Sequence, residues 1–217
     1  MNSISQLLKK HQAHYQILQI AGELGESQNI PVYIVGGYVR DTLLGKNCKD
    51  IDIMVEGDGI KFANILAKKL NISITIEYNK FGTAMIPYPD LEIEVATART
   101  ETYNPNSRKP EISPSSVVQD MSRRDFTINA IAASLSPNNF GELYDPFQGL
   151  NDLQKNRIVT PMDPDETFSD DPLRMLRAVR FASQLEYDID PITFASISKN
   201  YQRLEIISWE RIRDEII

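Results

Sequence analysis

The stretch VYIVGGYVRDTLLGKNCKDIDIMV, residues 32–55, decides the fold of the chain. Its opening VYIV run is rich in β-branched residues and is typical of a buried strand, which the double glycine Gly36-Gly37 ends. A short helix closed by Gly45 is expected next, followed by a second strand over residues 50–56. This succession of strand, turn, helix and strand predicts a mixed α/β fold for the first half of the chain.

The same mixture extends outward from this stretch in both directions. Apolar residues at helical spacing predict one amphipathic helix, or a pair of them, within residues 3–27. On the other side, Asp58 is an N-cap candidate for a helix that ends at Leu70. Three further strands are expected over residues 72–78, 81–88 and 91–98.

The second half of the chain has a different composition. Residues 99–115 are rich in Pro, Ser and Asn without periodicity, which predicts a long exposed loop. Later periodic segments all predict helices, over residues 126–134, 171–184, 192–201 and 208–217. We therefore expect an α/β head domain over residues 1–155 and a helical domain over residues 156–217. The last helix reaches the end of the sequence without a capping signal, which indicates that the chain belongs to something longer.

Composition and charge restrict the class of protein. A hydrophobic content of 41% with 24% charged residues is ordinary for a globular protein. The net charge of −7 argues against a surface coated with cations, so any nucleic-acid contact must be local. No run approaches the roughly 18 apolar residues of a membrane span, and the N-terminus does not resemble a signal peptide, so we expect a cytoplasmic protein without membrane contact. The single cysteine, Cys48, excludes an internal disulfide.

Two aspartates at the start of the second expected strand are candidate metal ligands. Asp50 and Asp52 are two residues apart, so the period of a strand places both carboxylates on one face. Such a pair can hold divalent cations, and either Glu94 or Glu92 on a later strand can supply a third carboxylate. Three carboxylates on a sheet suit nucleotidyl transfer, because two metal ions can stabilise both the attacking and the leaving oxygen.

The double glycine has two interpretations. Gly36 and Gly37 at a helix start would let a triphosphate approach the backbone N–H groups, with Arg40 one turn further on to contact phosphate oxygens. The alternative is a plain turn between a strand and a helix. The segment contains neither a Walker loop nor a Rossmann fingerprint.

Charged residues gather in a third segment, DMSRRDFTINA, residues 120–130. Arg123, Arg124 and Asp125 come immediately before the helix expected there.

A fourth segment, SDDPLRMLRAVRF, carries an arginine row at residues 169–181. Asp170 and Asp171 are expected at the helix start, where Pro172 is favoured in the first turn. Three arginines follow on one stripe of the helix: Arg174, Arg177 and Arg180. The row can line a triphosphate groove, or it can be a solvated face paired with acids.

Taken in order, these segments resemble the class II tRNA nucleotidyltransferase and bacterial poly(A) polymerase family. The resemblance covers residues 30–217 and rests on GGYVRDTLLG, KDIDI, RRDFTINA, LYDPFQGLNDL and DDPLRMLRAVRF. It implies an α+β fold: a nucleotidyltransferase head related to DNA polymerase β, with a mixed sheet and flanking helices, followed by an all-α neck. The neck over residues 156–217 is expected to be incomplete.

The resemblance also implies roles for the candidate residues. The Mg²⁺ ligands would be Asp50 and Asp52, with Glu94 as the third carboxylate, and the triphosphate would be held by Gly36, Gly37 and Arg40. The ribose would be recognised by Arg123, Arg124 and Asp125. The base would be recognised by Asp171 and Arg174, and the phosphate contacts would be completed by Arg177 and Arg180.

The activity implied is template-independent addition of C and A from CTP and ATP to the 3′ end of tRNA, with Mg²⁺ as cofactor and release of pyrophosphate. Addition of A alone or poly(A) synthesis is an alternative, because MVEGDGIKFA, residues 54–63, is similar to the A-adding branch. A catalytically silent module that binds nucleotide or RNA is a second alternative. The pair Asp50 and Asp52 speaks against it, because like charges without a metal ion cost stability.

Overall fold

The computed structural model describes residues 2–104 and 107–216, with the backbone alone over Glu101–Glu111. The chain forms two compact units that it enters more than once. The first unit contains Met1–Thr100, Ile112–Asp120 and Ile131–Asp145, and the second contains Glu101–Glu111, Met121–Ala130 and Pro146–Ile217. The domain boundary at residue 155 stays a prediction.

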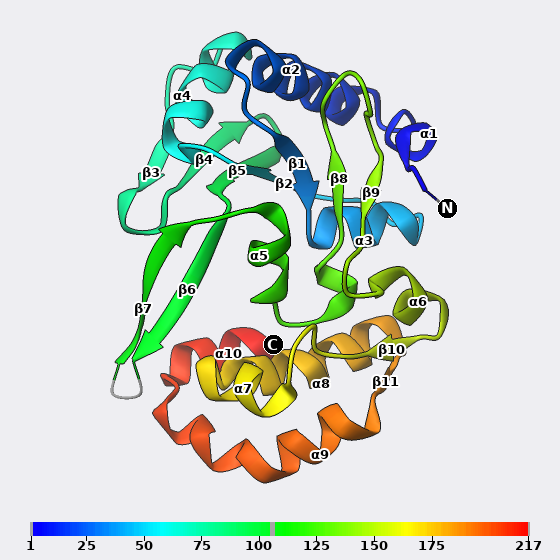
Figure 1. Cartoon of the computed structure of the whole chain (residues 1–217), viewed down its shortest axis with the longest axis vertical. Helices are drawn as coiled ribbons and strands as arrows, with labels where there is room; N and C mark the ends of the chain where they lie inside the picture. The colour runs from blue at the N-terminus through cyan, green and yellow to red at the C-terminus, as the bar shows by residue number, and fades with distance from the viewer. Residues whose placement is uncertain (1, 105–106, 217) are drawn as a thin grey trace. The chain divides into compact units, whose positions relative to one another are not determined.

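The first unit is built on a mixed seven-stranded sheet with the order β3-β4-β5-β2-β1-β8-β9 (Figure 1). The strands are β1 (Val32–Val35), β2 (Asp50–Val55), β3 (Ile76–Tyr78), β4 (Thr83–Tyr88), β5 (Leu91–Thr97), β8 (Ala132–Ser134) and β9 (Leu143–Tyr144). Among the described strands of this sheet, β2 and β5 run parallel and the other neighbouring pairs run antiparallel. The expected α+β fold with a mixed sheet is confirmed.

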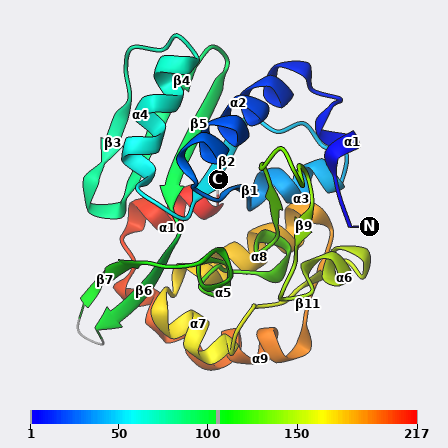
Figure 2. The same cartoon turned by 45° about the horizontal axis from the view of Figure 1, so that its top comes forward.

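Helices of the first unit cover one face of this sheet. They are α1 (Ser5–Leu8), α2 (Gln12–Gln28), α3 (Gly37–Leu43) and α4 (Gly59–Lys69). Figures 1 and 2 show α2 and α4 lying along the sheet, and Ile34, Ile53 and Ile93 are buried in the core of this unit. The Asp58 side chain caps α4 by accepting a hydrogen bond from the N–H of Lys61 at 3.0 Å, as predicted.

Close packing of α4 against β5 depends on a glycine. A Cβ at Gly59 would lie 2.6 Å from the backbone nitrogen of Thr97, and the N–H of Gly59 donates to the Thr97 hydroxyl at 2.9 Å. The helix start therefore lies directly on the strand that carries Glu92 and Glu94.

The helix expected over residues 126–134 is wrong. The segment forms a 3₁₀ turn, η2 (Thr127–Asn129), and then strand β8, which pairs antiparallel with β1. Its residues are buried almost without exception, and a short apolar run of this kind does not distinguish a buried helix from a buried strand. The segment becomes a strand because it pairs with the edge of β1 that β2 leaves open.

The long loop expected over residues 99–115 is also wrong. The backbone forms two strands, β6 (Arg99–Asn104) and β7 (Ser107–Pro114), which pair with each other in a separate two-stranded sheet. Because these strands do not belong to the main sheet, they need no alternation of apolar residues, and the sequence gives no periodic signal.

The second unit is mainly helical. Its helices are α6 (Gly149–Gln154), α7 (Pro164–Asp170), α8 (Leu173–Leu185), α9 (Pro191–Asn200), the 3₁₀ helix η3 (Tyr201–Ile206) and α10 (Trp209–Ile216). Two short strands, β10 (Arg157–Ile158) and β11 (Asp188–Ile189), pair in parallel. Helix α5 (Val117–Ser122) begins in the first unit and ends in the second. Asp170 was expected at the start of the arginine helix, but it ends α7, and α8 begins at Leu173 after its N-cap Pro172.

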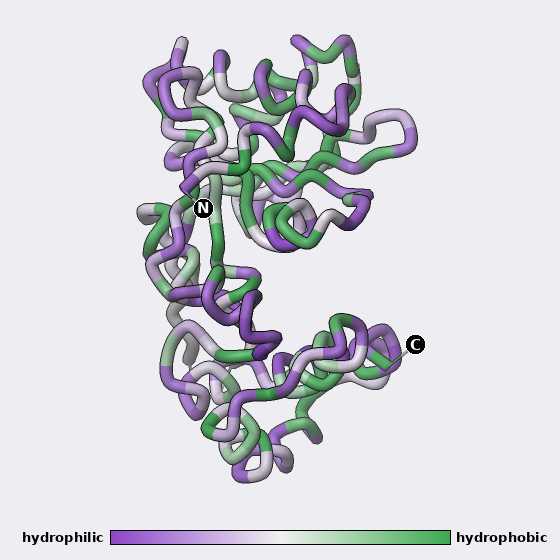
Figure 3. The backbone as a smooth tube through the Cα atoms, turned by 90° about the vertical axis from the view of Figure 1, so that its right-hand side faces the viewer, coloured by the Kyte–Doolittle hydropathy of each residue, from purple (hydrophilic) through white to green (hydrophobic). Residues whose placement is uncertain are grey.

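Among the residues that the structure describes, no helix is both long and apolar enough to cross a membrane. Hydrophobic and hydrophilic segments alternate along the backbone (Figure 3).

Candidate active site

Four carboxylates occupy one face of the sheet in the first unit. Strands β2 and β5 pair in parallel, with Asp50 opposite Glu92 and Asp52 opposite Glu94. Directly paired residues share a face, and neighbouring strands lie about 4.8 Å apart. The intervening residues Ile51, Ile53, Ile93 and Val95 are buried on the opposite face. The core thus fixes the direction in which the acidic side chains point.

The register decides which glutamate accompanies which aspartate. Glu94 is the partner of Asp52, and Glu92 is the partner of Asp50. Asp50, Glu92 and Glu94 are exposed, whereas Asp52 is half-buried. The sequence left Glu92 and Glu94 as alternatives, and both lie on the acidic face.

These side chains suit a hard divalent cation. Carboxylate oxygens are the protein ligands that Mg²⁺ prefers, and four like charges on neighbouring strands repel one another unless a cation offsets them. Among the described residues, no three His, Cys, Asp or Glu side chains already form a metal-binding group. The donor type and the shared face fit Mg²⁺, with Asp50 and Asp52 as the residues that would hold it.

The double glycine lies next to the acidic face. Strand β1 runs antiparallel to β2, and the pairing of Ile34 with Ile53 brings the end of β1 beside the start of β2. Gly36 has φ 68° and ψ −135°, a conformation that residues with a Cβ rarely adopt, and it is the N-cap of α3. The turn between β1 and α3 therefore requires glycine and places the helix start near Asp50 and Asp52.

Arg40 is held by its neighbour in the structure. Its Nε and Nη2 atoms each donate to the Asp41 carboxylate at 2.9 Å, and the Arg40 side chain is only 11% exposed. A Cβ added at Gly37 would lie 3.6 Å from Arg40 Nη2, so the guanidinium lies over the helix start. Its position suits contact with a phosphate, but Asp41 already balances its charge.

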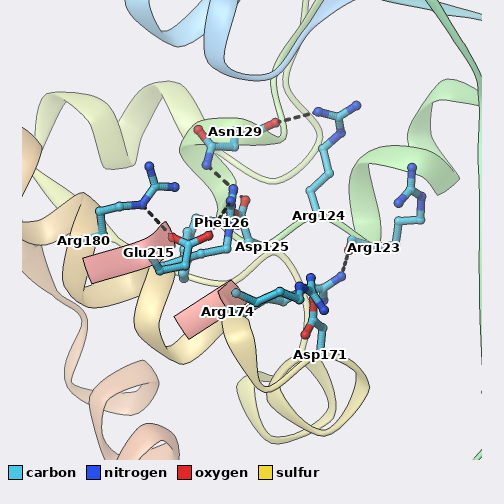
Figure 4. A network of polar contacts seen from close by, with 11 residues as sticks. Arg123, Arg124, Asp125, Phe126, Asn129, Asp171, Arg174, Arg180 and Glu215 are labelled. Atoms are coloured by element: carbon cyan, nitrogen blue, oxygen red, sulfur yellow. Dashed lines mark hydrogen bonds and ion pairs between the residues drawn. The ribbon is translucent and has the colours of Figure 1, made fainter. Parts of the chain in front are cut away.

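In the second unit, each arginine of the α8 row has a partner (Figure 4). The buried Arg174 donates through Nη2 to the Arg123 carbonyl at 2.6 Å and through Nη1 to the Thr167 carbonyl at 3.4 Å. Arg177 binds Asp125, and Arg180 Nε lies 2.7 Å from Glu215 Oε2. The row therefore pairs with acids and carbonyls, and these contacts fix its orientation.

Asp125 is buried and surrounded by donors. Its carboxylate accepts from the N–H of Phe126 at 2.8 Å, from Asn129 Nδ2 at 3.0 Å, and from Arg177 Nε and Nη2 at 2.8 and 2.6 Å. Burial acts to raise the pKa of Asp125, but the Arg177 guanidinium and the hydrogen bonds from Asn129 and Phe126 outweigh it and hold the pKa below its usual value. The ribose contact assigned to Asp125 stays a prediction; in the structure its carboxylate holds Arg177 in place.

Replacing Asp125 by asparagine should destabilise the chain by about 2 kcal/mol, less than for a fully buried pair because Arg177 is partly exposed. Because the folded pKa of Asp125 is lowered, its contribution is complete above the unfolded pKa and is lost as the pH falls through the folded value. Urea unfolding at pH 7 and pH 3 should show a stability gap between wild type and variant that shrinks in acid. Exposed Asp188→Asn is the control, and an equal gap for Asp125→Asn at both pH values would contradict the assignment.

Asp171 and Arg174 lie at the junction of α7 and α8. Asp171 Oδ1 accepts from the N–H of Leu173 at 3.2 Å, and Oδ2 lies 3.6 Å from Arg211 Nη2. The Arg174 N–H donates to the Asp171 carbonyl at 3.1 Å, so the two residues form the first turn leading into α8. Arg124 donates from Nη1 to the Asn129 carbonyl at 3.5 Å within the same unit.

A family of known proteins shares the sequence of this part of the chain. The family described as "Poly A polymerase head domain" matches residues 32–159, which contain the acidic face, the double glycine and Asp125. The chain belongs to this family. The resemblance inferred from the five sequence segments is confirmed.

Relatives of this poly(A) polymerase head-domain chain are enzymes that act on tRNA. The A-adding tRNA nucleotidyltransferase of Geobacter sulfurreducens is 38% identical over 93% of this chain and 23% of its own length. The CCA-adding enzyme of Lactobacillus johnsonii is 37% identical over 92% of this chain and 48% of its own length. A crystal structure of a tRNA nucleotidyltransferase complexed with a primer tRNA and an incoming ATP analog superposes with a TM-score of 0.79 and 36% identity over 90% of this chain and 54% of the other.

The chain thus spans about half or less of the length of these relatives. Their match covers 90–93% of this chain and so extends beyond residues 32–159 of the head-domain family.

Sequence reasoning missed two residues of the arginine row's surroundings. Arg211 and Glu215 lie on α10, where the segment SWERIRDEII was interpreted only as a terminal helix. Their i, i+4 spacing places both on one face of a helix, which was the available signal. This spacing alone does not show that Arg211 and Glu215 contact α8 and its N-terminal turn, because that depends on how α10 packs against α8.

Proposed function

We propose that the chain is the catalytic part of a template-independent nucleotidyltransferase that adds C and A from CTP and ATP to the 3′ end of tRNA and releases pyrophosphate. The observation that carries this proposal is the acidic face, on which Asp52 is in register with Glu94 beside the Gly36-Gly37 turn. Membership of the head-domain family and the tRNA-directed relatives support it. Such a protein would work in the cytoplasm.

The residues of the first unit would serve the transfer step. Asp50 and Asp52 would hold Mg²⁺, which when bound stabilises the charge that develops on the attacking and leaving oxygens. The terminal 3′-hydroxyl oxygen of the RNA forms a bond to the α-phosphorus of the nucleotide as the bond to the β-phosphate oxygen breaks. Glu94 is the nearest candidate to take the hydroxyl proton, and Gly36, Gly37 and Arg40 would hold the triphosphate.

The residues of the second unit would select the nucleotide. Asp171 offers hydrogen-bond acceptors and Arg174 offers donors, one helical turn apart, so both can face one base edge. Arg174 has five N–H donors, of which its two carbonyl contacts use two. Arg123, Arg124 and Asp125 would contribute to the ribose contact, and Arg177 and Arg180 to the phosphate contacts.

Addition of A alone is the second candidate. The Geobacter sulfurreducens relative is an A-adding enzyme and matches 93% of this chain. Incubation with tRNA that ends before CCA, and with tRNA that ends in CC, decides between the two in the presence of Mg²⁺ and labelled CTP or ATP. Incorporation of C into the first substrate indicates CCA addition, whereas incorporation of A into the second substrate alone indicates A addition. A protein that incorporates neither nucleotide would contradict the proposed function.

The 217-residue chain should bind tRNA at least tenfold more weakly than its longer relative from Lactobacillus johnsonii, while binding ATP and CTP with Mg²⁺. The physical reasons are that this chain has a net charge of −7, whereas affinity for nucleic acid comes largely from cations that neutralise phosphates, and that it spans only 48% of that relative's length. Filter binding over a salt titration measures both affinities. Equal affinity at each salt concentration would contradict the prediction, and nucleotide binding by the same sample controls for folding.

A further inference from the structure

Helix α10 contacts Asp171 and the arginine row through two oppositely charged residues. Arg211 and Glu215 are four residues apart on the same face of the helix, and α10 packs against α8. Arg211 Nη2 lies 3.6 Å from Asp171 Oδ2, Glu215 Oε1 accepts from Arg177 Nη1 at 3.4 Å, and Glu215 Oε2 lies 2.7 Å from Arg180 Nε. One helix therefore contacts Asp171, which precedes the row, and two of the three arginines of the row.

The side chain of Glu215 is much less exposed than that of the neighbouring Asp214. The Glu215 side chain is 11% exposed, whereas Asp214 beside it is 65% exposed and pairs with Arg213. Withdrawing a carboxylate from water costs free energy unless cations compensate, and here two guanidinium groups do so. Glu215 thus bridges Arg177 and Arg180, and Figure 4 shows its contact with Arg180.

We propose that Glu215 is a positioning residue for nucleotide binding, which holds Arg177 and Arg180 in the orientation that receives the triphosphate. This inference rests on the proposed function. Arg177 is fixed from two sides, by Asp125 at 2.6 Å and by Glu215 at 3.4 Å. Glu215 Oε2 meets Arg180 at Nε, 2.7 Å away, as an ion pair without hydrogen-bond geometry, so this contact does not use the two terminal amino groups of Arg180.

The benefit of this bridge is conformational. A free arginine side chain loses rotamer entropy when it is fixed. Phe181 provides a second surface, with the guanidinium carbons of Arg177 and Arg180 at 5.3 and 4.7 Å from the ring centre. Glu215 fixes both arginines before the nucleotide arrives, so that binding does not bear this cost again.

Charge alone makes the opposite prediction. A triphosphate is strongly negative, so a carboxylate beside its arginines repels it and competes for the same donors. If Glu215 acted only by its charge, removing that charge would tighten nucleotide binding. A positioning role predicts weaker binding although the chain becomes less negative, so the sign of the change separates the two.

The test measures the affinity of the 217-residue chain for ATP with Mg²⁺ by calorimetry. Glu215→Gln should weaken ATP binding by about five- to tenfold, the equivalent of one lost charge-assisted interaction. Asp214→Asn removes the same charge from the neighbouring exposed position and should change the affinity less than twofold. Glu215→Asp keeps the charge but shortens the side chain, and it should also weaken binding.

Two kinds of negative result remain distinguishable. Unchanged or tighter ATP binding by a folded Glu215→Gln variant, or full affinity in Glu215→Asp, would overturn the positioning role. Absence of ATP binding by the wild type would instead contradict the proposed function. In that case NMR of the arginine ¹⁵Nε signals still tests the contact between Glu215 and Arg180. Loss of Glu215 should shift the Arg180 signal, and an unchanged signal would refute the contact.

Discussion

Replacing Asp52 by alanine should abolish nucleotide incorporation at any Mg²⁺ concentration. The loss of a shared metal ligand removes several kcal/mol of transition-state stabilisation, so we expect a rate reduction of about a thousandfold or more. The fold should persist, because Asp52 is half-buried on a face with three other carboxylates, and removing one like charge relieves repulsion. Single-turnover incorporation of labelled ATP into tRNA measures the effect, and thermal unfolding checks the fold.

Glutamine variants of the two glutamates provide the matched comparison. Glu94 is in register with Asp52, whereas Glu92 is in register with Asp50 at the exposed end of the pair. Glu94→Gln should lower the rate far more than Glu92→Gln if Glu94 is the third carboxylate. Near-normal turnover by Asp52→Ala would place the metal site elsewhere.

Replacing Asp171 by alanine should reduce the use of CTP and ATP and narrow their advantage over UTP and GTP. Cytosine and adenine each present an amino donor beside a ring-nitrogen acceptor, which matches a carboxylate beside a guanidinium. Uracil and guanine present a carbonyl and a ring N–H, so like groups would face each other. A bidentate base contact discriminates by about 1 to 3 kcal/mol, or roughly five- to 150-fold.

Asp171 has a partner in the structure that a base would have to displace. Asp171 Oδ2 lies 3.6 Å from Arg211, whose side chain is 49% exposed, and such pairs are weak enough for a base to displace. Competition among the four nucleotides measures the preference, with Asp188→Ala as an exposed control. An unchanged preference in Asp171→Ala would show that Asp171 only supports the helix start, where it accepts from the N–H of Leu173.

The part of the fold that sequence alone predicts is the part specified locally. The strand, glycine turn, helix and strand over residues 32–55 have distinct local signals, as does the Asp58 cap, and all of them form. Strand β8 was predicted as a helix because its pairing with β1 is a contact between distant segments. The β6–β7 pair was predicted as a loop for a different reason: its strands lie outside the main sheet, so they carry no alternation of apolar residues.

The candidate site divides in the same way. The period of a strand puts Asp50 and Asp52 on one face, but their registration with Glu92 and Glu94 depends on how β2 meets β5. Asp125 was predicted to contact the ribose, and its burial against Arg177 depends on the packing of α8. Glu215 was missed because its partners lie 35 and 38 residues earlier in the chain.

The parallel pairing of β2 with β5 limits the insertions and deletions that strand β2 tolerates. Successive residues of a strand point to opposite faces, so a one-residue insertion or deletion within β2 would turn part of the strand over, with isoleucines outward and carboxylates inward. Burial of unpaired carboxylates costs stability. Length changes within this strand should therefore reduce stability together with activity, whereas the loop before Asp50 can absorb them.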